Sequence, residues 1–264
     1  MLQLRQFSGM NCHYIRYSMD YFLDSMAALG YERIEIWAAS PHYFAPDFDD
    51  KKTKKLKNML DSRNLKLACL TPEQVTYPVN IASREEDVRK RSIELHKKTL
   101  EHAALLESPL MLLTPGCGYY AEPREDAWKR SADSIAQIAR HAETVGVTIA
   151  LEHLSPASSN LINSAADLQR MLQDVNLPRL KAMFDVGQVN ILGEDVPTYF
   201  DLLGGDIVHI HFVDGTPGGH LALGDGDIDL QAALDAIANA GYTGHISLEI
   251  ADRRYFSNPQ LADE

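Results

Sequence analysis

The chain has 264 residues, and its 45% hydrophobic and 23% charged fractions are those of an ordinary globular protein. Its net charge of -12, from 25 basic and 37 acidic residues, opposes binding to nucleic acid or anionic membranes and suits a small-molecule partner. It has no apolar run long enough for a membrane span and no signal-peptide core at its start. Three separated cysteines predict neither a disulfide frame nor a cysteine-rich zinc site, so we expect a cytoplasmic protein.

Short apolar runs alternate with longer amphipathic segments along the whole chain. Strands are predicted at 3–7, 33–37, 66–71, 110–114, 147–152, 180–185, 207–213 and 245–250. Helices are predicted at 18–29, 47–62, 83–106, 124–145, 164–175, 195–203 and 227–240. The alternation predicts an α/β protein, and eight strands match one (β/α)₈ TIM barrel formed by residues 1–264 as a single catalytic domain. Few residues follow Glu249, so we expect an incomplete eighth helix or a natural chain that continues.

A weak internal repeat supports a barrel. The segments 28–37, 144–153 and 239–250 each contain a glycine between the end of a predicted helix and a strand that carries a glutamate near its end. We expect Gly30, Gly146 and Gly241 to take the left-handed conformation that ends a helix.

The alternation of side chains along a strand predicts which residues face the barrel interior. In the seventh strand, Val208, Ile210 and Phe212 form the outward set, and His209 and His211 face inward. The same rule, applied to the last four strands, puts four polar residues inside at the C-terminal strand ends: Glu152, Asp185, His211 and Glu249.

Active sites of TIM-barrel enzymes lie at these strand ends. Three carboxylates crowded there would repel one another unless a cation neutralised them. Three oxygen donors and one imidazole suit Mn²⁺, Mg²⁺, Co²⁺ or Zn²⁺. The alternative is a set of unrelated polar groups at a wet barrel mouth.

Other residues could form a substrate pocket at the same rim. Trp37 faces inward and could stack on a substrate, and His42 could form a wall beside it. His220 could line the pocket, and Arg253 could hold an anionic group; the alternatives are a packed loop for His42 and solvent exposure for Arg253. Glu35 and His209 lie one layer lower and are expected to be structural or to support His211. Asp214 either contacts His211 or the substrate, or caps the following turn.

Several segments resemble the xylose-isomerase-like barrel superfamily of sugar isomerases and epimerases. They are ALGYERIEIWAASPHYFAPD, IALEHLSP, FDVG, HIHFVDG and the stretch from His220 to Asp229, and the nearest branches are ketose 3-epimerases and fructoselysine 3-epimerases. The resemblance implies one divalent metal ion, Mn²⁺ first, held by Glu152, Asp185, His211 and Glu249. It also implies that Glu152 and Glu249 are the catalytic acid and base, and that the protein forms a homo-oligomer.

The chain departs from these relatives at two positions. Ser158 stands where they often have glutamate, and Gln188, a predicted substrate-binding residue, stands where they often have histidine. The shorter or neutral side chains predict a roomier pocket and a larger or substituted sugar, such as a fructosamine.

The sequence therefore predicts a metal-dependent sugar epimerase or isomerase that removes a proton next to a carbonyl and forms a metal-stabilised enediolate. Three alternatives remain open. One is a metal-dependent lyase or dehydratase acting on a polyol-derived ketone. The others are an apurinic-endonuclease-like phosphodiesterase and a non-catalytic sugar-binding barrel.

Overall fold

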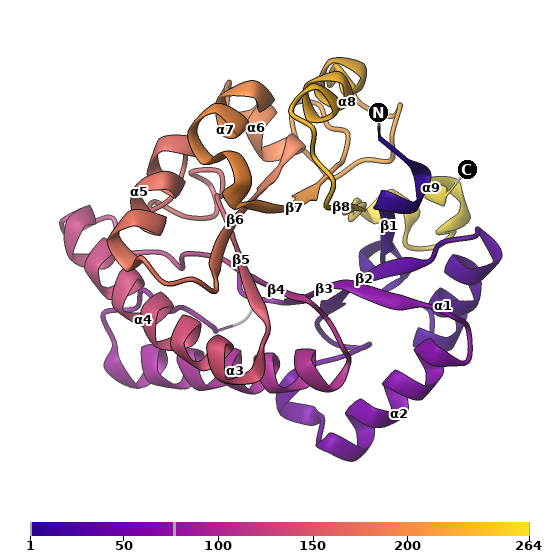
Figure 1. Ribbon diagram of the computed structural model, residues 1–264, viewed down its shortest axis with the longest axis horizontal. Helices are drawn as coiled ribbons and strands as arrows, with labels where there is room; N and C mark the ends of the chain where they lie inside the picture. Colours follow the sequence, from indigo (N-terminus) through magenta and orange to yellow (C-terminus); the bar gives the residue numbers. More distant parts are fainter. Residues whose placement is uncertain (1, 76–77, 264) are drawn as a thin grey trace.

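The computed structural model describes residues 2–75 and 78–263. Eight parallel strands form a closed barrel in chain order, with β1 paired to both β2 and β8. The strands are β1 (Phe7–Met10), β2 (Arg33–Ala38), β3 (Lys66–Pro72), β4 (Leu110–Leu113), β5 (Thr148–Glu152), β6 (Leu180–Asp185), β7 (Ile207–His211) and β8 (His245–Leu248). Figure 1 looks down into the ring, with the helices outside it. The predicted TIM barrel is confirmed.

The helices surround the barrel in the predicted order. They are α1 (Met19–Ala28), α2 (Asp50–Asp61), α3 (Glu86–Leu105), α4 (Arg124–Val145), α5 (Ala165–Val175), α6 (Val186–Leu192), α7 (Val196–Leu203), α8 (Leu230–Asn239) and α9 (Gln260–Asp263). The short α6 was not predicted. The four-residue α9 follows β8 and a short 3₁₀ helix. No helix within the described ranges is long and apolar enough to cross a membrane.

The first strand differs from the prediction. Residues Leu4–Gln6 form a 3₁₀ helix, and the strand runs over Phe7–Met10 rather than 3–7. Gly9 lies within this strand, where a Cβ atom would stand 2.3 Å from the sulfur of Met26 in α1. Glycine lowers the strand signal in the sequence, although here it allows α1 to pack closely on the strand.

The helix ends follow from local side-chain chemistry. Side-chain oxygens of six residues accept a backbone N–H at the start of an α-helix: Ser18, Asp49, Ser164, Asp185, Asp195 and Asp229. Gly30, Gly146 and Gly241 have φ angles of +84°, +76° and +70°, which confirms the predicted left-handed positions. A Cβ atom on any of the three would meet nothing within 4 Å, so the backbone conformation, rather than space, favours glycine there.

The hydrophobic core has two parts. The larger part lies between strands and helices, and it includes the predicted outward residues Ile210 and Phe212. A small cluster fills the barrel interior: Cys69, Leu110, Leu112, Ala150 and Met183. Val208 packs against this inner cluster, so its predicted outward orientation is wrong. The pairing of β6 and β7 shifts by one residue at this point, which breaks the strict alternation.

Candidate active site

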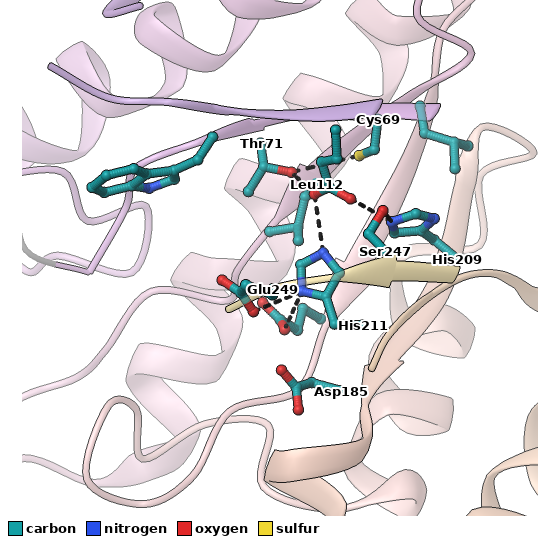
Figure 2. Close-up of polar contacts among 12 residues, drawn as sticks. Cys69, Thr71, Leu112, Asp185, His209, His211, Ser247 and Glu249 are labelled. Atoms are coloured by element: carbon teal, nitrogen blue, oxygen red, sulfur yellow. Dashed lines mark hydrogen bonds and ion pairs between the residues drawn. The ribbon is translucent and has the colours of Figure 1, made fainter. Parts of the chain in front are cut away.

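Four polar side chains meet at the C-terminal rim of the barrel. Glu152, Asp185 and His211 are the last residues of β5, β6 and β7, and Glu249 directly follows β8. Each residue offers one ligand atom, and these atoms lie within 4.8 Å of one another. Figure 2 shows Asp185, His211 and Glu249 gathered at one place. The structure thus brings together the four residues selected by strand alternation, and their role as metal ligands stays a prediction.

Asp185 uses its two carboxylate oxygens differently. Oδ1 accepts the backbone N–H of Gln188 at 2.9 Å and so caps the start of α6. Oδ2 is buried and has no hydrogen-bond partner, with His220 Nε2 3.6 Å away. Helix α6 therefore fixes the side chain and leaves one oxygen available at the site.

His211 is held between carboxylates on both sides of its ring. Nδ1 lies 2.9 Å from Glu249 Oε2 and 3.8 Å from Glu152 Oε1. Nε2 lies 3.0 Å from Glu35 Oε1, on the side away from the rim. Burial by itself lowers the pKa of His211, but Glu35 and Glu249 raise it well above its usual value.

Glu35 joins the two histidines of β7. Its Oε2 lies 2.6 Å from His209 Nε2, and the Thr71 hydroxyl donates to Oε1, the oxygen that also contacts His211. His209 Nδ1 is buried without a hydrogen-bond partner, so Nε2 is the ring nitrogen that contacts Glu35. Burial raises the pKa of Glu35, but the charges of His211 and His209 hold it well below its usual value. Sequence alternation identified Glu35 as inward and gave no sign of this bridge across the barrel.

The two glutamates of the rim lie in different electrostatic environments. Burial raises the pKa of Glu152 well above its usual value, and the charges of Glu249 and Asp185 add to this effect against the attraction of His211. Burial also raises the pKa of Glu249, but His211 and His220 outweigh it and hold that pKa below its usual range. Two carboxyl groups with opposite pKa shifts can serve as the acid and the base of one reaction.

His220 reaches the site from the loop after β7. Its Nε2 lies 3.4 Å from Glu249 Oε2, and its carbonyl accepts the backbone N–H groups of Ala251 and Asp252 at 3.0 and 3.3 Å. Its φ of +50° is unusual for a residue with a side chain. Burial lowers the pKa of His220, but Glu249 and Asp185 raise it well above its usual value. The predicted pocket position of His220 agrees with this placement.

The same loop is organised by Asp214. Its carboxylate accepts four backbone N–H groups at 2.8 to 3.1 Å, from Gly215, Gly224, Gly226 and Ile228. Burial raises the pKa of Asp214, but these donors hold it below its usual value. Of the two readings of Asp214, the structure supports the one in which it caps the following turn.

A cavity of about 210 Å³ lies above the four rim residues. Its lining includes the predicted residues Trp37, Gln188, His220, Glu152 and Glu249, together with Ser158. The Trp37 indole donates to Glu73 Oε2 at 2.9 Å. The sequence analysis did not select four further lining residues that follow the ends of β3, β4 and β5: Glu73, Gln74, Thr114 and Leu154. The sequence feature that could have identified these four residues is their position just after the ends of predicted strands. A larger cavity of about 550 Å³, bordered by Gln6 and Tyr242, lies away from this cluster.

Two predicted residues are not brought to the cavity. His42 Nδ1 lies 2.8 Å from the Asn11 amide nitrogen, and its Nε2 lies 2.7 Å from the Tyr17 carbonyl, so both ring nitrogens are engaged. Arg253 is exposed at the start of a 3₁₀ helix, Arg253–Tyr255. Neither is among the described residues that line the cavity. The alternation rule cannot place residues that lie in loops beyond the strands.

The fold and the site define a class of protein. Residues 23–264 match the family described as xylose isomerase-like TIM barrel, and the chain belongs to this family. Its relatives include sugar 3-epimerases, and the expectation of an enzyme of the sugar isomerase and epimerase class is confirmed.

One relative is the fructoselysine 3-epimerase of Escherichia coli O157:H7, which is 30% identical over 95% of this chain and 91% of its own length. The solved structure of an L-ribulose 3-epimerase matches with a TM-score of 0.77 and 25% identity, over 91% of this chain and 80% of that one. The structure of a D-tagatose 3-epimerase-like protein matches with a TM-score of 0.83 and 22% identity, over 97% and 94% of the two chains, and supports the fold.

Proposed function

We propose that this chain is a divalent-metal-dependent 3-epimerase of ketoses, with substituted ketoses such as fructosamines as its substrates. The observation that carries the proposal is the group of three carboxylates and one imidazole at the barrel rim, with ligand atoms within 4.8 Å of one another. Glu152 and Glu249 belong to this group and also line the cavity above it. Both could therefore reach a sugar bound there.

The residues at the rim fit a divalent cation. Asp185 Oδ2 is buried without a hydrogen-bond partner, and its ion pair with the His220 ring is long, at 3.6 Å, which leaves this oxygen able to bind a cation. Glu152, His211 and Glu249 add two oxygen ligands and one nitrogen ligand close by. Carboxylates with one imidazole suit Mn²⁺, which we propose as the native ion.

Epimerisation next to a carbonyl requires a proton to leave one face of the carbon and a proton to return to the other face. Glu152 ends β5 and Glu249 follows β8, so their carboxylates enter the cavity from different strands. The ionised carboxylate takes the proton, and the electron pair of the broken C–H bond stays on the substrate as an enediolate. The other group, protonated as a carboxylic acid, delivers its proton to the opposite face of that carbon and is left as a carboxylate. A divalent cation held by the rim residues would stabilise the negative charge on the oxygens of the enediolate.

Two of the side chains that line the cavity support a substituted ketose as the substrate. Ser158 and Gln188 both line the cavity, and neither presents the longer carboxylate or the imidazole that the family resemblance leads one to expect. The relative from Escherichia coli is named for fructoselysine, which is a substituted ketose. Other relatives are named for D-psicose and L-ribulose, so free ketoses belong in the same assay.

The experiment is a substrate panel with metal-free protein supplemented with Mn²⁺. Free ketoses and fructosamines are incubated with the protein, and the products are identified by NMR and mass spectrometry. We expect the 3-epimer, of unchanged mass, with turnover that depends on Mn²⁺ and is fastest for a fructosamine. A product lighter by one water would indicate a dehydratase instead. No turnover of any member of the panel would contradict the proposed function.

A further inference from the structure

The cavity at the rim adjoins a second cavity. The first has a volume of about 210 Å³ and the second about 370 Å³. Four of the residues that line both are Gln74, Thr114, Leu154 and Ser158. Because the two cavities share these residues, they lie next to each other, with Glu152 and Glu249 lining the first and Arg91 lining the second.

The two cavities differ in their charged side chains. The first cavity is lined by Glu73, Glu152 and Glu249, with His220 beside Glu249, and its described lining includes no arginine or lysine. Among the described residues lining the second cavity, Arg91 of α3 is the one arginine or lysine. Its guanidinium donates to the Pro78 carbonyl at 3.2 Å, which holds it at the border of the cavity. Within the described lining of the two cavities, arginine is therefore found only in the second cavity, away from the rim.

The wall of the second cavity is partly apolar. Leu154, Val79 and Val88 line the second cavity, and Glu85 lines it together with Arg91. Such a wall suits an aliphatic arm. One guanidinium matches one carboxylate in a bidentate pair, whereas the Glu85 carboxylate opposes a doubly charged phosphate.

We propose that the second cavity is a subsite for an aliphatic arm carried by the ketose, and that Arg91 binds a carboxylate at the end of that arm. The sugar itself, bound in the first cavity, is unphosphorylated. This inference rests on the proposed function for the position of the sugar, and goes beyond it in naming the substituent and the residue that recognises it.

A pair of matched substrates tests the subsite. Fructosamines made from 6-aminohexanoate and from hexylamine share the same carbon chain and differ in the terminal carboxylate. We expect the Mn²⁺-loaded protein to prefer the 6-aminohexanoate derivative in kcat/KM. Arg91→Gln should lower kcat/KM for this derivative by about 3- to 10-fold, mainly through KM, because the pair is partly exposed to solvent. The hexylamine derivative should be unaffected.

Lys90→Gln is the control variant. Lys90 precedes Arg91 in α3, pairs with Glu86 at 2.7 Å, and is not in the described lining of either cavity. For each of the two derivatives, this variant should have the same kcat/KM as the natural protein. Equal kcat/KM for the two derivatives in the natural protein, or an equal effect of Arg91→Gln on both, would overturn the subsite.

Calorimetric binding of the 6-aminohexanoate derivative separates this inference from the proposed function. Binding weakened by Arg91→Gln, without turnover of any ketose, would support the subsite and contradict the epimerase. Epimerisation with binding that is unchanged in Arg91→Gln would support the epimerase and overturn the subsite. A phosphorylated ketose that binds more tightly than both fructosamines would also overturn the assignment of a carboxylate.

Discussion

Glu35 and His211 are joined across the inside of the barrel, with 3.0 Å between Glu35 Oε1 and His211 Nε2. Glu35 belongs to β2 and His211 ends β7, so the contact links strands that are not neighbours in the sheet. Because the carboxylate accepts the Nε2 proton, the ring keeps Nδ1 directed at Glu152 and Glu249. A carboxylate that orients a metal-binding imidazole in this way strengthens metal binding.

We expect Glu35→Gln to weaken Mn²⁺ binding by about 10- to 100-fold, as measured by calorimetry on metal-free protein. The amide offers one acceptor oxygen and one donor nitrogen to two histidine rings that both need an acceptor. Glu194→Gln is the matched control. Glu194 accepts the Tyr199 hydroxyl at 2.7 Å and is outside the described cavity lining, so its loss should leave Mn²⁺ affinity unchanged. Equal affinity in Glu35→Gln and the natural protein would refute the positioning role.

Proton transfer and metal binding should separate in three rim variants. Glu152→Gln and Glu249→Gln should each lower epimerase turnover by about 100-fold or more, because an amide cannot accept the proton. Both should retain part of the Mn²⁺ affinity, since an amide oxygen can still coordinate, whereas His211→Ala should lose most of it. Turnover and Mn²⁺ titration on the same preparations measure this. Near-normal turnover in both glutamine variants would rule out the two-glutamate mechanism.

Asp214→Asn should destabilise the protein by about 2 kcal/mol or more at pH 7, because the carboxylate accepts four backbone N–H groups. The folded protein holds the pKa of Asp214 below its ordinary value of 3.8. The stabilisation is therefore fully present above about pH 5 and is lost as the pH falls through the folded pKa. Denaturant unfolding of both proteins at several pH values should show a difference that shrinks below pH 3.8.

Asp229→Asn is the control on the same loop. Asp229 accepts one backbone N–H, from Ala232, and asparagine caps a helix nearly as well as aspartate. Its unfolding free energy should change by only a few tenths of a kcal/mol. A similar effect of both substitutions would mean that the four contacts of Asp214 add little.

Gly146→Ala should cost about 1 kcal/mol of unfolding free energy, because Gly146 ends α4 with a φ of +76°. A Cβ atom would meet nothing within 4 Å, so the cost measures the backbone conformation without a clash. Gly205→Ala is the matched control, since its surroundings are equally open and its φ lies outside the left-handed region. Thermal or denaturant unfolding measures both variants. The same loss of unfolding free energy in Gly146→Ala and Gly205→Ala would contradict this explanation.

Strand alternation predicted the position of the rim residues because their strands end in register. Glu152, Asp185 and His211 each have neighbours that pack outward, and a one-residue change of register would have buried the wrong face. The rule failed at Val208, where the pairing of β6 and β7 shifts by one residue. Such a shift depends on how two strands pair, so the sequence of either strand alone does not reveal it.

The contacts across the barrel could not be predicted for a related reason. The bond from Glu35 to His211 depends on how far β2 and β7 are staggered around the closed ring, which no local pattern encodes. Helix α6 was missed because it is short and contains Gly187, a poor helix former. The Asp185 cap at its start could have indicated it.

The carboxylate of Asp214 also bears on how substrates reach the barrel. Its four bonds tie down the loop from Gly215 to Ile228, and the carbonyl of His220 in the same loop is bound to Ala251 and Asp252. These hydrogen bonds therefore hold the loop on this side of the rim in one position. The second cavity, with the exposed Arg91 and Tyr119 at its border, has no residue of this loop in its described lining. On the proposed subsite, a substrate arm bound there would leave without any movement of the loop of His220.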